Sequence, residues 1–246
     1  MNISHERTQM YVNGKTTDRV LDGPYIVTGG SSGLGAATAD AIAMAGGTPI
    51  VFDINERRGG GESYRVDVAD SESVRQSVDT VAQRFGGLSG VIANAGIDAC
   101  GPFDKVPFAD WERVIRVNLI GVAALVHAAL PHLKASRGRI VTVASTLGLR
   151  ALSDASAYCA SKFGVVGFTR ALSAELRGHV GVTLLLPGGM RTSFFDGRDP
   201  QYKPGPDAGL NDPAEVARAV VFALSQAPSC DVREMLICPS TETSWP

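Results

Sequence analysis

Short apolar runs alternate with longer stretches of helical periodicity along most of the chain. The short runs predict strands at residues 25–28, 49–53, 64–66, 90–93, 139–144, 180–186 and 234–238. The longer stretches predict helices at 33–46, 71–85, 109–133, 156–176 and 213–225. Continuous apolar strands separated by helices indicate a parallel sheet. The predicted fold class is therefore α/β, a doubly wound parallel sheet of about seven strands with helices on both faces.

Three segments depart from this alternation. The link from Asp53 to Asp67 is rich in glycine and too short for a full crossover helix, so we expect a loop or a single turn there. Residues 188–212 are rich in glycine and proline and lack periodicity, and loops of this length often act as lids over a site. We call them the lid segment. Residues 1–22 precede the single predicted domain, 23–246, and the pair Asn13-Gly14 favours a hairpin in this extension.

Composition and charge argue against several kinds of partner. The chain has 246 residues, 44% of them hydrophobic, and a formal net charge of −2. It has no broad cationic field and no apolar run of membrane-spanning length, so we expect neither a nucleic-acid partner nor a membrane. Residues 1–22 lack the apolar core of an export signal, which predicts a cytoplasmic protein. The cysteines and histidines show no metal-ligand spacing, which predicts that the protein binds no metal. We expect Cys100, Cys159, Cys230 and Cys238 to be reduced and mostly buried thiols.

A glycine-rich turn, Thr28-Gly-Gly-Ser-Ser-Gly-Leu-Gly35, joins the strand predicted at 25–28 to the helix predicted at 33–46. Glycines let the backbone turn tightly and approach a pyrophosphate, whose charge the helix N-terminus then stabilises. The spacing is G-x-x-x-G-x-G rather than G-x-G-x-x-G, and a turn that binds no ligand is the alternative. The strand before it and the helix after it favour dinucleotide binding.

Asp53 ends the next predicted strand, about twenty residues beyond the glycines, where a carboxylate can accept hydrogen bonds from the adenosine ribose. A 2′-phosphate would meet that negative charge, and Ser32 offers no compensating cation. We therefore expect NAD as the cofactor, with NADP the less favoured one. Arg57 and Arg58 lie close enough in the sequence to oppose this preference, although solvated loop charges are their simpler interpretation.

Tyr158 and Lys162 lie four residues apart in a predicted helix, so their side chains share one face. A neighbouring ammonium is expected to lower the pKa of a phenol, which could then exchange a proton with an alcohol or carbonyl oxygen. A Tyr-x-x-x-Lys pair alone also occurs on ordinary surface helices. The dinucleotide site elsewhere in the chain favours the catalytic interpretation.

From about Gly23 to its C-terminus the chain resembles the short-chain dehydrogenase/reductase family, which has a Rossmann-type fold. The resemblance rests on Tyr158-x-x-x-Lys162 and on Thr28-Gly-x-x-x-Gly-x-Gly35. It also rests on further motifs in the same order and spacing: Asp67-Val68, Asn94-Ala95-Gly96, Asn118 within Val117-Asn118-Leu119, Ser145, and Pro187-Gly188. Each motif is common alone, whereas their joint order is specific.

The resemblance implies a role for each matching residue. Tyr158 would be the general acid/base, Ser145 would hydrogen-bond the substrate oxygen, and Lys162 would bind the nicotinamide ribose. Asn118 would hold a water of the proton relay, or it could merely bond a neighbouring carbonyl group. Ser145, Asp67 and Thr192 could instead be ordinary cap or turn residues. The expected cofactor-binding residues are Gly29, Ser31, Ser32, Gly33, Leu34, Gly35, Asp53, Asp67, Val68, Asn94, Ala95, Gly96, Tyr158, Lys162, Pro187, Gly188 and Thr192.

The function expected from these residues is NAD-dependent interconversion of a secondary alcohol and a ketone, by a homo-oligomer (a tetramer or a dimer). The alternative is a dinucleotide-binding sensor or regulator without catalysis, which would have no need of a tuned phenol. The expected substrate pocket is lined by Asp98, Leu147, Arg150, Met190, Phe194 and Phe195, with Asp98 and Arg150 as polar anchors. Sugars or polyols, hydroxy acids, steroids and small aliphatic alcohols all remain open as substrates, because loops determine specificity.

Overall fold

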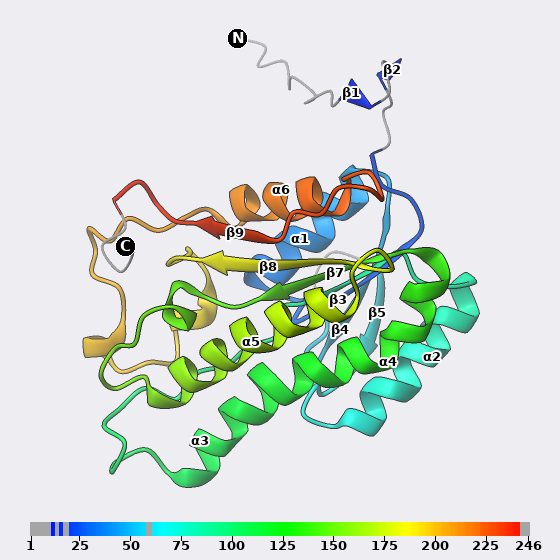
Figure 1. Ribbon diagram of the computed structural model, residues 1–246. Helices are drawn as coiled ribbons and strands as arrows, with labels where there is room; N and C mark the ends of the chain where they lie inside the picture. Colours follow the sequence, from blue (N-terminus) through cyan, green and yellow to red (C-terminus); the bar gives the residue numbers. More distant parts are fainter. Residues whose placement is uncertain (1–10, 13–14, 17–19, 58–60, 242–246) are drawn as a thin grey trace.

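A single parallel sheet organises the chain, as the computed structural model shows for residues 11–12, 15–16, 20–57 and 61–241 (Figure 1). Its seven strands lie in the order β5-β4-β3-β6-β7-β8-β9, and every neighbouring pair is parallel. Their bounds are β3 (Pro24–Thr28), β4 (Thr48–Asp53), β5 (Glu62–Arg65), β6 (Gly90–Ala93), β7 (Arg139–Val143), β8 (Gly181–Pro187) and β9 (Glu234–Ile237). The predicted fold class is confirmed.

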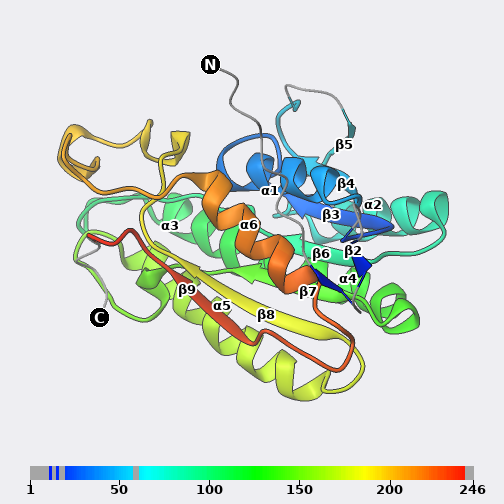
Figure 2. The same cartoon turned by 90° about the horizontal axis from the view of Figure 1, so that it is seen from above.

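Helices cover both faces of the sheet, as Figures 1 and 2 show from two directions. One face carries α1 (Gly33–Met44) and α6 (Pro213–Leu224), which pack against each other. The opposite face carries α2 (Ser71–Phe85), α4 (Gly121–Ser136) and α5 (Ser156–Glu175). The chain order changes direction between β3 and β6, and ligands of such sheets bind at the carboxyl ends of the strands beside this change.

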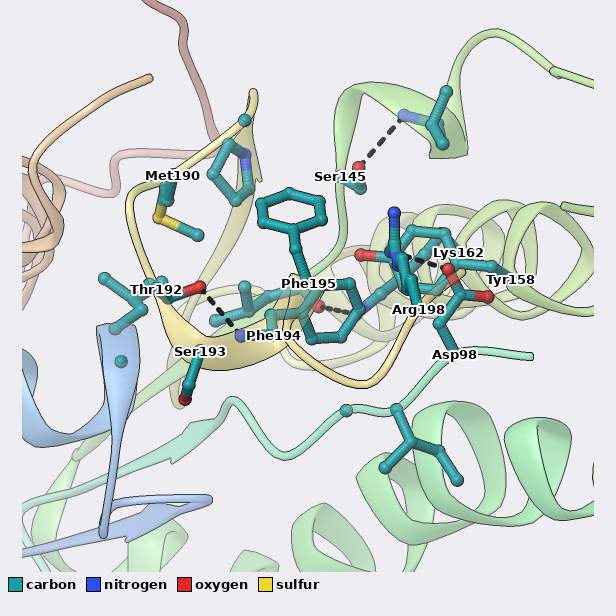
Figure 3. A pocket seen from close by; sticks show the side chains of 18 of the residues that line it. Asp98, Ser145, Tyr158, Lys162, Met190, Thr192, Ser193, Phe194, Phe195 and Arg198 are labelled. Carbon is teal, nitrogen blue, oxygen red and sulfur yellow. Dashed lines mark hydrogen bonds and ion pairs between the residues drawn. The ribbon is translucent and has the colours of Figure 1, made fainter. Parts of the chain in front are cut away.

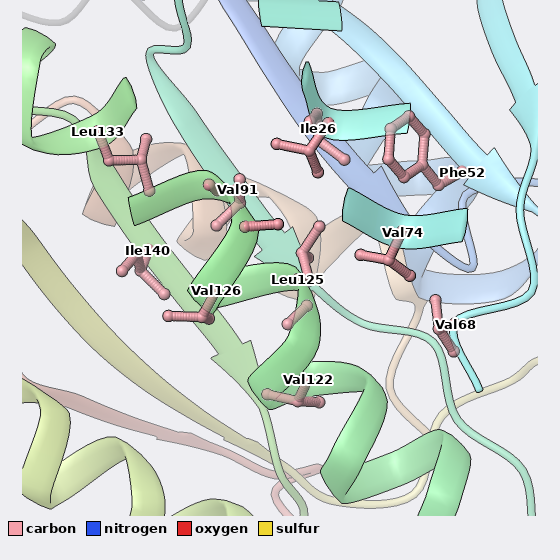
Figure 4. Packing of buried hydrophobic residues seen from close by; sticks show 14 of the residues in the cluster. Ile26, Phe52, Val68, Val74, Val91, Val122, Leu125, Val126, Leu133 and Ile140 are labelled. Carbon is pink, nitrogen blue, oxygen red and sulfur yellow. The ribbon is translucent and has the colours of Figure 1, made fainter. Parts of the chain in front are cut away.

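Alternate residues of each strand point to opposite faces and therefore fill two separate cores. Ile26, Val91 and Ile140 are fully buried against the side chains of α2 and α4, among them Val74 and Leu125 (Figure 4). Their neighbours along the strands face α1 and α6 instead: Val27, Ile92 and Val141. Burial of each large apolar side chain stabilises the fold by ~2 kcal/mol, so the two cores together fix the strands that carry the site.

The single helix predicted at 109–133 is longer than expected and is interrupted. The structure has α3 (Phe108–Ile115), a π-helical segment η1 (Arg116–Ile120) and then α4. Asn118 lies in η1, where its side chain bonds to Ile97 and to Ser161 rather than facing solvent. Such π-helical turns are frequent at functional sites. Periodicity alone does not signal one, because it depends on these distant partners.

The helical run Phe108–Ser136 is long and apolar enough to cross a membrane by length and composition alone, contrary to our expectation from the sequence. Its apolar positions are explained by packing, because Val122, Leu125, Val126 and Leu133 are buried in the core beneath the sheet. The prediction of mostly buried thiols was also wrong. Only Cys159 is buried, whereas Cys100 and Cys238 are partly exposed and Cys230 is exposed.

The structure also describes most of the three segments that depart from the alternation of strands and helices. No helix lies between β4 and β5 among the described residues 54–57 and 61, as predicted. The lid segment contains two short 3-10 turns, η3 (Ser193–Phe195) and η4 (Pro200–Tyr202), and Met190 forms a bridge to Asn211. In the N-terminal extension β1 (Tyr11–Val12) pairs antiparallel with β2 (Lys15–Thr16), while the predicted turn residues Asn13 and Gly14 lie outside the described residues.

Candidate active site

A cavity of about 940 Å³ opens at the carboxyl ends of the central strands. It is lined by fifteen of the seventeen residues that the sequence assigned to cofactor binding, which come from segments far apart in the chain. The two exceptions are Ser31 and Gly35, which do not line it. The structure thus brings the predicted motifs together at one end of the sheet.

The glycine turn is held in place by close packing of backbone against backbone. A Cβ on Gly29 would lie 2.9 Å from the Cα of Ala95, and a Cβ on Gly35 would overlap the carbonyl oxygen of Gly29. Asn94, the residue after β6, fixes the same turn, because its Nδ2 donates to the carbonyl oxygen of Thr28 at 3.0 Å. Gly35 therefore shapes the turn without contacting the cavity, and side chains larger than hydrogen have no room at these positions.

The N-terminus of α1 faces the cavity without a cap of its own. Its N-cap residue Ser32 makes no side-chain capping bond, and the first turn holds no acidic residue. In α2, by contrast, Asp70 accepts hydrogen bonds from the backbone N–H groups of Glu72 and Ser73. The free N–H groups and the helix dipole at the start of α1 suit an anionic group such as a pyrophosphate. The cavity at this end therefore fits a dinucleotide.

Asp53 is positioned at the other side of the glycine turn. Its two carboxylate oxygens accept from the backbone N–H of Ser31 at 3.0 Å and of Asn55 at 2.9 Å. The Ser31 hydroxyl donates to the Asn55 carbonyl at 2.8 Å. Arg57 forms an ion pair with Asp40 of α1. Arg58 lies outside the described residues.

Tyr158 and Lys162 face the cavity from α5, as Figure 3 shows. The Lys162 ammonium lies 5.5 Å from the centre of the Tyr158 ring and donates to the carbonyl oxygen of Val143 at 2.9 Å. Burial lowers the pKa of Lys162 to about 8, an effect that the charge of Asp98 opposes. The pKa of Lys162 therefore lies closer to neutral pH than that of a solvated lysine.

The expected low pKa of Tyr158 is not found. Burial raises the pKa of Tyr158 above its ordinary value, and a hydrogen bond with Ser145 only partly opposes this. The reason is that burial removes the charged phenolate from water, and its polar neighbours stabilise the phenolate by less than this desolvation costs. Ser145 also caps the 3-10 turn η2 (Thr146–Gly148) by accepting from the backbone N–H of Leu147 at 3.1 Å. Its hydroxyl thus has both the capping role and a position beside the phenol.

Asn118 does not line the cavity and is fully buried. Its oxygen accepts from the backbone N–H of Ile97 at 2.8 Å, and its Nδ2 donates to the Ile97 carbonyl at 2.9 Å and to Ser161 Oγ at 3.1 Å. The structure therefore gives Asn118 the simpler of the two roles that the sequence allowed, in which it ties the segment after β6 to α5. Its part in a proton relay remains a prediction.

The model for short chain dehydrogenases matches residues 25–203, which include the glycine turn, Ser145, Tyr158 and Lys162. The chain belongs to the short-chain dehydrogenase family. It is 35% identical over 228 residues to D-threitol dehydrogenase of Mycolicibacterium smegmatis. The aligned region covers 84% of this chain and 88% of that protein. The chain is also 35% identical to cis-4-hydroxycyclohexanecarboxylate dehydrogenase of Sinomonas cyclohexanicum, over 86% of this chain and 92% of that one.

Solved structures are similar as well. An alcohol dehydrogenase of Thermococcus sibiricus, complexed with 5-hydroxy-NADP, superimposes with a TM-score of 0.78 at 25% identity, over 88% of this chain and 96% of that one. Family membership and these similarities support an oxidoreductase that acts on CH–OH groups and uses NAD or NADP.

The substrate end of this short-chain dehydrogenase differs in part from prediction. Asp98, Leu147, Met190, Phe194 and Phe195 line the cavity as expected, and the Phe194 ring packs against Tyr158 with centroids 5.7 Å apart. Arg150 was a wrong choice, because it is exposed and does not line the cavity.

A cation from the lid segment, Arg198, lies at the substrate end instead. It forms an ion pair with Asp98 at 2.6 Å (Figure 3). Sequence reasoning missed Arg198, and it missed Tyr202 and Asp154, whose side chains are hydrogen-bonded to each other at 3.2 Å. The only sequence signal for these residues was their place in or beside loops at the carboxyl end of the sheet.

Proposed function

We propose that this chain is an NAD-dependent oxidoreductase that interconverts a secondary alcohol and a ketone, with Tyr158 as the general acid/base. The observation that carries the proposal is the arrangement of Ser145, Tyr158 and Lys162 on one wall of a cavity whose other end fits a dinucleotide. The names of the two relatives, a threitol dehydrogenase and a hydroxycyclohexanecarboxylate dehydrogenase, support a hydroxyl-bearing substrate.

The preference for NAD over NADP rests on Asp53. Its carboxylate is fixed by two backbone N–H groups at the rim where an adenosine ribose would lie, so a 2′-phosphate would meet an immobile negative charge. Among the residues that the structure describes, Arg57 is a nearby cation that could compensate, but it is paired with Asp40. The Thermococcus enzyme, complexed with an NADP derivative, shows that relatives of this fold accept the phosphate, so the preference has to come from these local charges.

Bound NAD would supply the hydride acceptor, and the residues of this chain would orient the substrate and move the proton. Ser145 and Tyr158 would both hydrogen-bond the reacting oxygen. Because burial raises its pKa, Tyr158 holds its proton at neutral pH and can donate it to a ketone oxygen. In the oxidative direction Tyr158 must first lose that proton, and the charged form of Lys162 beside the ring favours its loss.

A sensor without catalysis is the alternative, and the substitution Tyr158→Phe separates the two. It removes the proton donor and leaves the ring, so turnover of a secondary alcohol should fall by ~1000-fold or more, a loss typical of general acid/base groups. The dissociation constant for NADH, from nicotinamide fluorescence, should change by less than ~5-fold, because no more than one hydrogen bond is lost. Retained turnover in Tyr158→Phe would refute the assigned acid/base.

The same fluorescence titration with NADH and NADPH in parallel tests the coenzyme preference. NADH should bind tighter than NADPH by ~10-fold or more, because only NADPH brings a 2′-phosphate against the Asp53 carboxylate. Equal or reversed affinities would show that Arg57 or Arg58 binds the 2′-phosphate. Binding of neither coenzyme would contradict the enzyme and the sensor alike.

A further inference from the structure

The substrate end of the cavity holds a buried ion pair that the proposed mechanism leaves unused. Arg198 Nη2, in the lid segment, lies 2.6 Å from Asp98 Oδ2, in the segment after β6, and their side chains are 17% and 7% exposed. Both residues line the same cavity as Tyr158 and Lys162, and Figure 3 shows the four side chains there. One positive and one negative charge thus accompany the two residues assigned to proton transfer.

Stability does not explain the pair. Two charges removed from water lose about as much hydration free energy as their attraction returns, unless further hydrogen bonds satisfy them. Here the compensation is incomplete, because Arg198 Nε is buried and has no acceptor within the part of the chain that the structure describes. The charges themselves therefore call for another explanation.

An aromatic ring joins Arg198 to the catalytic phenol. The Arg198 guanidinium carbon lies 5.0 Å from the centre of the Phe194 ring and 4.6 Å from that of Phe195. The Phe194 ring in turn packs against the Tyr158 ring, with centroids 5.7 Å apart. Solvent screens a charge less where apolar groups exclude it. The guanidinium therefore acts on Tyr158 across an apolar contact.

The carboxylate of Asp98 is fixed by partners of its own. Oδ1 accepts from the backbone N–H of Ala99 at 2.7 Å, and Oδ2 accepts from Cys100 Sγ at 3.1 Å as well as from Arg198. Donors that bond a carboxylate favour its ionised form. Asp98 therefore keeps two donors, and its charge, where Arg198 is replaced by a neutral residue.

The two charges act on the catalytic groups in opposite directions. Burial has the largest influence, since it raises the pKa of Tyr158 and lowers that of Lys162. The Asp98 carboxylate raises the pKa of both, because it favours their protonated forms. The Arg198 guanidinium lowers the pKa of Tyr158, and a cation acts on a neighbouring ammonium in the same sense. Tyr158 and Lys162 thus respond to each charge with the same sign, whichever of them titrates.

Other ionisable groups surround the phenol. Lys162 and Cys159 belong to α5, and Cys100 bonds to Asp98. The remaining ionisable residues of the cavity lining are Asp53, Asp67, Arg113, Asp154, Tyr202, Lys203 and Asp207. Arg113, Lys203 and Asp207 are exposed, where solvent screens their charges, and Asp53 and Asp67 belong to the cofactor end. All of these groups stay in place when Asp98 or Arg198 alone is substituted.

We propose that Asp98 and Arg198 are positioning residues for proton transfer: the carboxylate holds protons on Tyr158 and Lys162, and the guanidinium favours their release. This inference rests on the proposed function and deepens it. Neither residue exchanges a proton itself. In oxidation the Tyr158 phenolate takes the hydroxyl proton of the alcohol as the hydride leaves for NAD. The balance of the two charges sets the pH at which that phenolate is available.

A titration without substrate tests the charge effect. Lysine with ¹³C at Cε is incorporated into the full chain, and the NMR signal of Lys162 is identified by its absence in Lys162→Met. We expect Asp98→Asn to lower the midpoint of the Lys162 titration and Arg198→Gln to raise it, each by ~1 pH unit, the effect of one neighbouring charge. Both substitutions keep a side chain that can bond the remaining partner of the pair.

The pH profile of alcohol oxidation tests the consequence for the reaction. The substrates are butan-2-ol, cyclohexanol and threitol, with NAD, and NADH absorbance gives kcat/KM. The limb on which kcat/KM rises with pH should move down in Asp98→Asn and up in Arg198→Gln, by ~1 pH unit. A purely structural role would lower kcat/KM in both variants and move this limb in neither.

Three further variants separate charge from shape. Arg198→Lys keeps the cation without the planar fork, so neither midpoint should move. In D98N/R198Q the midpoints should lie above those of Asp98→Asn and below those of Arg198→Gln. This double variant leaves no buried unpaired charge, so it tests the sign against either single variant if the other folds poorly. Arg191→Met should change nothing, because Arg191 is exposed on the lid segment and does not line the cavity.

The possible outcomes are distinct. Opposite shifts of the Lys162 titration in Asp98→Asn and Arg198→Gln, with matching shifts of the rising limb, support the inference. Shifts of one sign in both variants, or no shift, overturn it and leave the dehydrogenase intact. Opposite shifts of Lys162 with an unmoved pH profile also overturn it, since the charges would then not control proton transfer. Opposite shifts without oxidation of any of these alcohols, with either coenzyme, contradict the proposed function itself.

Discussion

The two ends of the cavity are built in different ways. At the cofactor end, backbone groups determine the geometry: the Gly29–Ala95 approach, the bonds from Asn94 to Thr28, and the uncapped start of α1. At the substrate end, side chains from separate loops determine it, through the pairs Asp98–Arg198 and Asp154–Tyr202. Backbone geometry demands particular residue types at fixed spacing, whereas side-chain pairs can form between many residue types. The first end can therefore be recognised from a sequence, whereas the side-chain pairs of the second end cannot.

The largest effect is expected from a methyl group added at the cofactor end. In Gly35→Ala the new Cβ would overlap the Gly29 carbonyl oxygen, which cannot move without displacing the whole turn. Overpacking of this kind costs ~3 kcal/mol, and we expect the free energy of unfolding to fall by that amount and NADH binding to be lost. Denaturant unfolding and nicotinamide fluorescence measure the two effects.

Gly167→Ala is the matched control. Gly167 is exposed in α5, and a Cβ there would meet no atom within 4 Å. Alanine favours helices over glycine, so this variant should be more stable by ~0.5–1 kcal/mol and should bind NADH normally. If Gly35→Ala bound NADH as well as Gly167→Ala does, backbone geometry would not control the cofactor end.

The features that the sequence could predict lie mainly at the cofactor end, and those that it missed lie mainly at the substrate end. The strands, the glycine turn, Asp53 and the Tyr158–Lys162 pair depend on local periodicity and fixed spacing, and the structure places all of them as expected. Arg150 was chosen because it lies close to Ser145 in sequence, whereas Arg198 reaches Asp98 only through the path of the lid segment. The raised pKa of Tyr158 was missed for a similar reason, because burial depends on the packed structure and not on the neighbour four residues away.

The next effect concerns Lys162, which lies between the two ends. Burial lowers its pKa from 10.5 to about 8, so between these values the unfolded chain binds a proton that the folded chain does not. The contribution of Lys162 to stability therefore rises with pH across this window, by roughly 2 kcal/mol between pH 8 and 10. Groups with raised folded pKa values act in the opposite direction, among them Cys100, with a pKa raised from 9.0 to about 12, above pH 9, and Tyr158 above pH 10.

The measurement is denaturant unfolding of the ligand-free protein at several pH values up to 10. The free energy of unfolding of Lys162→Met, relative to that of the unmodified chain, should fall by roughly 2 kcal/mol between pH 8 and 10, since a methionine cannot titrate. Lys134→Met, at an exposed position of α4, should show no such fall. A difference between Lys162→Met and the unmodified chain that stays constant with pH would show that Lys162 does not titrate in this window.

A smaller change is expected from Asp53→Ser, which removes the charge at the rim of the cofactor end. The affinity ratio of NADH to NADPH should fall by ~10-fold. This factor corresponds to ~1.4 kcal/mol of charge repulsion, the free energy that shifts a pKa by about one unit. The ratio should not reverse strongly, because Asp40 still holds Arg57 away from a 2′-phosphate. Asp79→Ser, in α2 outside the cavity, is the control and should leave the ratio unchanged. No change in Asp53→Ser would place the selecting charge elsewhere.

The smallest effect is expected at the substrate end, from Tyr202→Phe. The substitution removes the hydroxyl that bonds Asp154 at 3.2 Å, one of several contacts that hold the lid segment against the rest of the site. A hydrogen bond of this kind contributes ~1 kcal/mol, so KM for the alcohol should rise by ~3-fold to 5-fold. The NADH dissociation constant should stay the same, because the contact lies at the other end of the cavity. Tyr64→Phe removes a hydroxyl that bonds Arg84 at the same distance outside the cavity, and it should change neither value. A change in NADH affinity in Tyr202→Phe would show that the two ends are coupled through the lid segment, and the separation drawn between them would then fail.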